Sequence, residues 1–188
     1  MRLRLWKANK MLGYVGANSI ELYNDLNKDV HKIFEMLDND KDSQFLRRTT
    51  VKTSFSYIEC VPYVMKYYLR RRLHRINYEL NDKEKALLYE FDNHKISLLD
   101  NFKNTFKLAK KMLLKNDFDL KTSGNEFKSL QKSIHVRDRI THPKKHRDII
   151  ISDEEICNLF VAVEYVGNTF IGFLNFNTKD ETKIIEGI

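Results

Sequence analysis

The chain has 188 residues, of which 42% are hydrophobic and 31% are charged, so it can bury a core and is too apolar for wholesale disorder. Only two prolines and six glycines are present, which argues against a β-sandwich or barrel with its many turns. The net charge of +7 and the pI near 9.3 favour a polyanionic partner, nucleic acid above all, although a lysine-rich surface can also serve solubility alone.

Apolar residues recur at three- and four-residue steps along most of the chain, and this spacing predicts helices. The expected helices cover 18–37, 42–74, 81–91, 97–113, 126–141 and about 153–176. We therefore expect an all-α protein, a bundle of about five to six helices joined by short loops. Its expected parts are an N-terminal extension (1–16), the helical bundle (17–177) and a C-terminal tail (178–188).

Polar residues mark the expected helix ends. A capping box pairs a side chain before the first turn with an acidic residue three positions later. Such pairs are Asn18 with Glu21, Asn81 with Glu84, Ser97 with Asp100, and Ser152 with Glu155. Pro62 lies inside the helix expected over 42–74 and predicts a kink there, or two abutting helices.

Cys60 and Cys157 both have apolar sequence neighbours, so we expect buried free thiols in a reducing compartment. Two cysteines cannot form a zinc site alone, and no histidine stands at ligand spacing from either. Residues 1–16 make a poor signal peptide. Residues 156–176 are apolar but carry four polar side chains that are costly in lipid, so we expect a core helix, no membrane contact and a cytoplasmic protein. The four are Asn158, Glu164, Asn168 and Asn175.

The helix expected over 126–141 changes character at its end. Its apolar stripe is formed by Phe127, Leu130 and Ile134. The same spacing next reaches Arg137 and Thr141, so a charge stands where an apolar side chain is expected. Arginine is rarely buried unless it is paired, so Arg137 should face solvent, an interface or a cleft. Asp138 and His142 share this end of the helix.

Arg137 and Asp138, followed by three residues and then His142, match the R-[N/D/H]-x-x-x-H motif of HEPN ribonucleases, and Pro143 follows as in many members. The chain resembles the HEPN family best over about 99–173, more loosely through the first two helices, and not over 1–16. The motif is short. Its weight comes from its place at the end of the penultimate helix of an all-helical chain.

The resemblance implies an endoribonuclease that needs no metal or other cofactor and acts as a homodimer with a composite active site. His142 would exchange protons with the ribose 2′-hydroxyl or the leaving 5′-oxygen. Arg137 would stabilise charge on the phosphate, and Asp138 would orient His142 or the partner's Arg137. The products would be 2′,3′-cyclic phosphate and 5′-hydroxyl ends. By analogy alone, the protein would be a toxin or antiviral-defence effector, with an antitoxin or regulatory protein as a further partner.

Further residues are expected to support this site. The residues expected to contact RNA are Arg139, Thr141, Lys144, Lys145 and Arg147. Glu59, in the second helix, is a candidate auxiliary acid. The arginine-rich end of that helix, 70–75, is interpreted as a solvated face rather than an RNA site.

Two other functions remain open. One is a HEPN-like module that binds RNA, nucleotides or a protein without cutting, since a histidine at a helix C-terminus is often only a favourable charge beside the helix dipole. The other is a basic DNA-binding protein. It ranks last because no helix-turn-helix signature is present.

Overall fold

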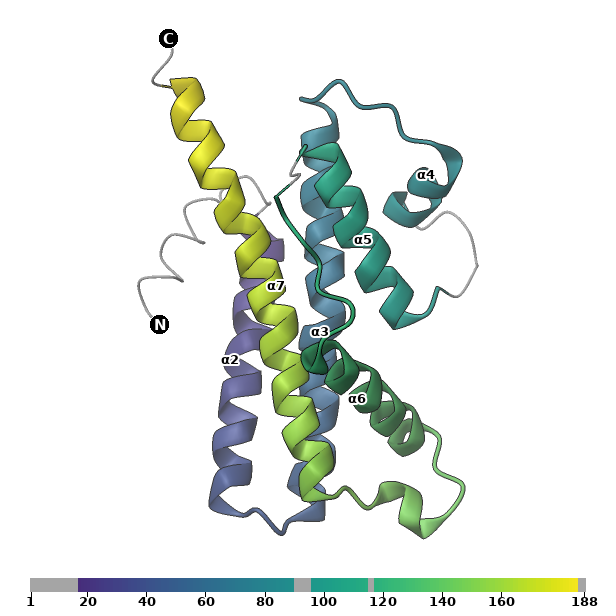
Figure 1. Cartoon of the computed structure of the whole chain (residues 1–188). Helices are drawn as coiled ribbons and strands as arrows, with labels where there is room; N and C mark the ends of the chain where they lie inside the picture. Colours follow the sequence, from purple (N-terminus) through teal and green to yellow (C-terminus); the bar gives the residue numbers. More distant parts are fainter. Residues whose placement is uncertain (1–16, 90–95, 115–116, 186–188) are drawn as a thin grey trace. The chain divides into compact units, whose positions relative to one another are not determined.

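The structure is a computed structural model that describes residues 17–89, 96–114 and 117–185. These residues contain six α-helices and one short 3₁₀ helix but no strand (Figure 1). The elements are α2 (Ala17–Asn39), α3 (Gln44–Leu73), α4 (Asp82–Tyr89), α5 (Leu98–Met112), α6 (Asn125–Thr141), η1 (His146–Ile149) and α7 (Asp153–Ile185). The predicted all-α class and helix number are confirmed.

The chain divides into two compact units, each assembled from segments that are distant in sequence. The motif unit comprises 22–60 and 121–167, and the second unit comprises the remaining described residues. The division crosses α3 beside Pro62 and crosses α7 after Gly167. Each unit is therefore described by itself.

Side-chain caps begin three of the helices at positions that the sequence predicts, and two of these caps are reciprocal capping boxes. At α4, Asn81 N–H donates to Glu84 and Glu84 N–H donates to the Asn81 side chain, both at 3.0 Å. Ser152 and Glu155 make the same reciprocal pair before α7, and Ser97 Oγ accepts from Asp100 N–H before α5. These bonds satisfy N–H groups that have no partner inside the helix.

Two helix boundaries differ from the prediction. Helix α2 already includes Ala17, so Asn18 lies inside the helix rather than capping it. Helix α3 continues as one helix through Pro62, so of the two predicted alternatives the pair of abutting helices is not formed. Helix α7 extends to Ile185 and includes most of the segment expected to be a tail. The end of the helix predicted at Phe91 lies outside the described residues.

A buried tyrosine pair holds α2, α3 and α7 together in the motif unit. The hydroxyl groups of Tyr23 and Tyr57 are 3.1 Å apart, and both rings are buried. A Cβ atom at Gly167 would lie 2.7 Å from the Tyr57 hydroxyl oxygen, so glycine lets α7 approach α3 closely. Burial raises the pKa of Tyr23 and that of Tyr57 above their ordinary value, so both hydroxyl groups stay neutral.

The second unit has an aromatic core. The Phe106 ring contacts the rings of Phe102, Phe118 and Phe173 with centroid distances of 4.9, 6.1 and 5.9 Å. Tilted and edge-to-face ring pairs are favourable beyond the area they bury. This cluster fixes the buried face of α5 and leaves its other face to solvent.

By length and composition alone, the segment Asp153–Leu174 of α7 is long and apolar enough to cross a membrane. Of the most apolar window in this segment, 33% is buried inside the structure. Within the motif unit it packs edge-to-face through Phe160 on Phe34 and through Tyr165 on Phe127. Within the second unit, Phe173 is fully buried. Helix α7 therefore packs through some of its apolar side chains, while most of the window is not buried inside the structure.

The two cysteines have different surroundings. Cys60 is buried as expected, but Cys157 is exposed, so the predicted burial of Cys157 was wrong. On α7 the buried positions include Leu159, Ala162 and Val166, which share one helical face. Cys157 precedes Leu159 by two residues and so lies on another side of the helix. Apolar neighbours in sequence do not establish burial in a helix.

This difference predicts that a single thiol of the native protein reacts with DTNB at pH 8. Burial raises the pKa of Cys60 to about 11, and its thiol is also shielded from the reagent, whereas Cys157 is accessible. We expect one equivalent of thionitrobenzoate from the native wild type, none from the native Cys157→Ser variant, and two from the denatured wild type. Rapid release of two equivalents from the native protein would contradict the burial of Cys60.

Candidate active site at the end of helix α6

Helix α6 ends where the motif predicts. Proline at 143 disfavours helical geometry at His142, and His142 has left the helical region with φ −125° and ψ 59°. Its backbone N–H still donates to Asp138 O at 3.1 Å. The residue therefore closes the last turn of α6, and it is exposed.

The buried face of α6 differs in detail from the predicted stripe. Buried side chains along the helix are Phe127, Ser129, Leu130, Ser133, Val136 and Ile140. Ile134 is only half-buried, and Thr141 is exposed. Arg137 follows the buried Ser133 by four residues and precedes the buried Ile140 by three, so it lies on this face, and its side chain is 29% exposed. This position lets the arginine stem pack while the guanidinium reaches the surface.

The Arg137 guanidinium is engaged by two carboxylates and one aromatic ring. It donates to Asp138 Oδ1 at 2.9 Å and to Glu59 Oε1 on α3. Its central carbon lies 5.3 Å from the centroid of the buried Phe55 ring, within the range of a cation–π contact. The Arg137 side chain is 29% exposed. The guanidinium is therefore fixed in orientation and still reachable from solvent.

The charges of this cluster do not cancel. One guanidinium faces the carboxylates of Glu59 and Asp138, which gives a formal charge of −1 before His142 is considered. A negative cluster repels an incoming phosphate unless a cation is added or a carboxylate moves aside. Glu59, expected as an auxiliary acid, is thus placed beside Arg137.

The side chains of His142 and Asp138 do not pair with each other within the chain. In the described residues, the imidazole makes no hydrogen bond or ion pair, and Asp138 pairs with its neighbour Arg137. The expected Asp138–His142 contact is therefore not formed. The Thr141 hydroxyl donates to Arg137 O at 2.7 Å, inside the helix, which ties it to the backbone.

The basic loop after α6 is held by one carboxylate. Asp148 accepts hydrogen bonds from the backbone N–H groups of Lys144 and Lys145 at 2.8 and 2.9 Å. These bonds, the one from Lys144 first, hold the pKa of Asp148 below its usual range. The side chains of Lys144, Lys145 and Arg147 are exposed, so the loop presents three cations beside His142.

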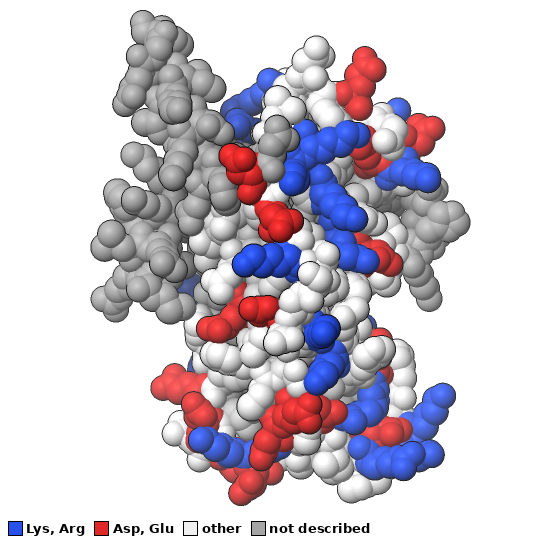
Figure 2. All heavy atoms as spheres, in the orientation of Figure 1, with Lys and Arg blue, Asp and Glu red and all other residues white. Residues whose placement is uncertain are grey.

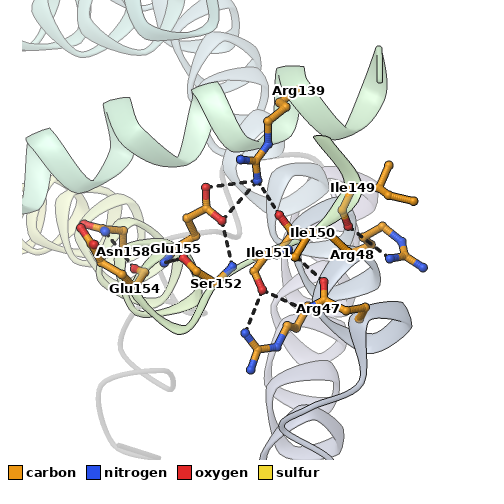
Figure 3. A network of polar contacts seen from close by, with 11 residues as sticks. Arg47, Arg48, Arg139, Ile149, Ile150, Ile151, Ser152, Glu154, Glu155 and Asn158 are labelled. Atoms are coloured by element: carbon orange, nitrogen blue, oxygen red, sulfur yellow. Dashed lines mark hydrogen bonds and ion pairs between the residues drawn. The ribbon is translucent and has the colours of Figure 1, made fainter. Parts of the chain in front are cut away.

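Arg139 acts differently from its neighbours in the motif. Its Nη2 donates to Ile150 O at 2.9 Å and pairs with Glu155 at 3.1 Å (Figure 3). Glu155 also accepts from Ser152 N–H in the capping box. Arg139 therefore joins α6 to the start of α7, and this engagement competes with its expected contact to RNA.

Three residues at the start of α3 hold the other side of the same segment. Gln44 exchanges two hydrogen bonds with the backbone of Ile151, at 2.9 and 3.0 Å. Arg47 donates to Ile151 O at 2.8 Å, to Lys41 O at 2.8 Å and to the Asp153 carboxylate. Arg48 donates to Ile149 O at 3.2 Å (Figure 3). The segment that follows the basic loop is thereby fixed to α3.

A pocket of about 370 Å³ lies on another side of α6. It is lined by Lys132, His135, Val136, Arg139, Ser152, Glu154, Glu155 and Asn158. His135 and Arg139 are each two positions from Arg137, so their side chains leave the helix about 200° around its axis from that of Arg137. The pocket is therefore separate from the Arg137 cluster.

Sequence patterns missed Phe55, Arg47 and Gln44 as neighbours of this region. Phe55 had a detectable signal, because it lies one helical turn before Glu59 on the same side of α3. Nothing local to Arg47 or Gln44 indicates a partner more than 100 residues away. In the described part of the chain, no group of three or more His, Cys, Asp or Glu residues could hold a metal ion.

No family model matches the chain, and neither a curated protein nor a solved structure matches it.

Proposed function

We propose that the chain is a metal-independent endoribonuclease of the HEPN type that cuts RNA through Arg137 and His142. The observation that carries the proposal is their placement at the exposed end of α6. The imidazole lacks a partner in the described residues, and the guanidinium is oriented by Glu59, Asp138 and Phe55. We further propose a cytoplasmic location and a role as a toxin or defence effector, restrained by an antitoxin or regulator.

In this mechanism the 2′-hydroxyl oxygen attacks the adjacent phosphorus, and the bond to the 5′-oxygen breaks. One His142 removes the 2′-hydroxyl proton, and a second imidazole gives a proton to the 5′-oxygen. The products are a 2′,3′-cyclic phosphate and a 5′-hydroxyl. Because two imidazoles are required, the proposal includes a homodimer whose two motifs line one cleft.

Arg137 would stabilise the extra charge on the phosphorane oxygens. An arginine side chain has five N–H donors, and Glu59 and Asp138 take one donor each from the two terminal nitrogens. The remaining donors suffice for a bidentate contact with phosphate. The surrounding cations Lys144, Lys145 and Arg147 would offset the negative charge of the two carboxylates.

The test is digestion of a defined single-stranded RNA in EDTA, with analysis of the product ends. Cyclic phosphate and 5′-hydroxyl ends are expected. A matched RNA with a 2′-deoxy nucleotide at each cut site should remain intact, because it lacks the attacking oxygen. Cleavage of the deoxy-substituted RNA at the same positions, or 5′-phosphate products, would refute the mechanism.

A second candidate function is a HEPN-like module that binds RNA or a protein without cutting it. The observation that favours it is the formal charge of −1 at Arg137, Glu59 and Asp138, since two carboxylates already occupy the guanidinium. This function predicts binding without any cyclic-phosphate product, even with excess protein over RNA.

The ion pair between Glu59 and Arg137 should restrain the nuclease. In Glu59→Gln we expect KM for RNA to fall by about 3- to 10-fold. The substitution removes the repulsion between the Glu59 carboxylate and the phosphate, which amounts to about 1 kcal/mol in a solvent-exposed site. The free energy of unfolding should change by less than about 1 kcal/mol, since exposed ion pairs contribute little.

Steady-state kinetics over a range of salt concentrations measure this effect, with Glu164→Gln as a matched control on an exposed part of α7. A raised KM in Glu59→Gln alone would contradict this prediction, because it would mean that the contribution of Glu59 to orienting Arg137 outweighs its repulsion of the phosphate.

A further inference from the structure

The positive charge of the chain is distributed unevenly between the two units. The motif unit contains fourteen lysines and arginines and fourteen aspartates and glutamates, so its formal net charge is zero. The whole chain contains 33 basic and 26 acidic residues. The entire excess of +7 therefore lies outside the unit that carries the motif.

Ion pairing limits the electric field of the motif unit despite its basic loop. Four of its cations pair with carboxylates across the fold, namely Arg47 with Asp153, Arg137 with Glu59, Arg139 with Glu155 and Lys132 with Glu154. Paired charges contribute little field at the distance of an approaching phosphate backbone. A nuclease built on this unit needs phosphate affinity from elsewhere.

Helix α5 in the second unit carries a lysine row, defined here as Lys103, Lys107, Lys110 and Lys111. Phe102, Phe106 and Ala109 form the buried face of the same helix. Figure 2 shows Lys and Arg side chains gathered in the area where Figure 1 draws α5. The row spans about 12 Å at a rise of 1.5 Å per residue.

The two central lysines of the row are not neutralised. Lys103 pairs with Asp100 and Lys111 with Glu84, both at 2.8 Å. Lys107 and Lys110 make no ion pair or hydrogen bond within the described residues. The charge of Lys107 contributes, as the smallest cause, to the lowered pKa of the Asp100 carboxyl. The helix dipole favours cations in the last turn, at Lys110 and Lys111, but it does not account for Lys103 and Lys107.

We infer that the lysine row of α5 binds the phosphate backbone of single-stranded RNA without sequence preference, and that it supplies affinity which the neutral motif unit lacks. This inference rests on the proposed function for its choice of RNA. The contacts are electrostatic, so their strength should fall as salt rises.

The test compares two charge-reversed double variants with the same net charge. Lys107→Glu with Lys110→Glu changes the lysine row. Lys121→Glu with Lys128→Glu changes two exposed lysines of the motif unit that form no ion pair in its described residues. The ligand is a fluorescent, fully 2′-O-methylated RNA 20-mer, which cannot be cut by 2′-oxygen attack. Fluorescence anisotropy gives Kd from 50 to 200 mM salt, and circular dichroism verifies the fold of both variants.

For the lysine-row variant we expect the slope of log Kd against log salt to fall by about 1.4, since each phosphate contact contributes about 0.7 for a single strand. The gain in affinity between 200 and 50 mM salt should then shrink by about sevenfold. The control variant should keep most of the wild-type slope. Equal slopes in the two variants would overturn the inference, as would binding of the lysine row to phosphatidylserine vesicles but not to the oligonucleotide.

Failure of this inference and failure of the proposed function are distinguishable. If the lysine-row variant loses RNA binding but the wild type never cuts RNA, the inference about the lysine row stands and the proposed nuclease function fails. If the wild type cuts RNA in a way that depends on His142 but the lysine-row variant binds RNA as the wild type does, the nuclease function stands and the inference about the lysine row fails.

Discussion

Replacing His142 with alanine is expected to lower the rate of RNA cleavage by at least about 100-fold, the lower end of the range for losing a general acid or base. The loss should be larger if the two copies of His142 in a homodimer act as base and acid in one reaction. Stability should be nearly unchanged, because the side chain is exposed and makes no hydrogen bond or ion pair in the described residues. Single-turnover cleavage in EDTA and thermal unfolding measure the two effects.

His146→Ala is the matched control. His146 is also exposed and lies four residues further along the same loop, so its loss removes an imidazole of the same kind next to the motif. We expect its cleavage rate to stay within about threefold of the wild type, since a phosphate contact alone is a smaller effect than proton transfer. Equal losses in both variants would move the chemistry away from His142.

Local sequence patterns were sufficient for most of the helices. Apolar spacing predicted a helix over 97–113, where α5 lies, and the pairs Asn81–Glu84 and Ser152–Glu155 predicted the starts of α4 and α7. These signals succeed because a helical turn and its cap are made by residues within four positions of one another. Proline at 143 predicted the end of α6 for the same reason.

The surroundings of the motif were harder to predict, because they depend on long-range contacts. The apolar stripe was expected to run through Ile134, yet the buried face passes through Ser133 and Val136. A serine in the core carries no apolar signal, so the stripe was placed one position off. The partner of Arg137, Glu59, is 78 residues away, and its role as a pairing carboxylate followed from tertiary structure alone.

The division of the chain into two units was also absent from the sequence signals. No linker or change in composition marks it, since the boundaries fall inside α3 and α7. The total charge of +7 favoured a polyanionic partner but gave no location for its binding. Only the grouping of residues in space reveals that the motif unit is neutral.

Replacing Arg47 with alanine is expected to cost about 3 kcal/mol of unfolding free energy, a large share of the stability of an ordinary domain. The Arg47 side chain is only 9% exposed and donates three hydrogen bonds, to Lys41 O, Ile151 O and Asp153. Hydrogen bonds from a charged donor contribute about 1.5 to 3 kcal/mol each, but water can reach Asp153, which limits the sum. Tm should fall by about 6 to 12 °C for a chain of this size.

Arg48→Ala is the neighbouring control, because Arg48 makes a single 3.2 Å bond to Ile149 O and is less buried. It should lose about 1 kcal/mol or less. Limited digestion with trypsin adds a local measurement, since Lys144, Lys145 and Arg147 are exposed cleavage sites in the loop that Arg47 helps to hold. Faster cutting there in Arg47→Ala than in Arg48→Ala, at equal distance below each Tm, would show that Arg47 fixes the loop beside His142. Equal cutting would mean that Gln44 and Arg139 hold the segment without it.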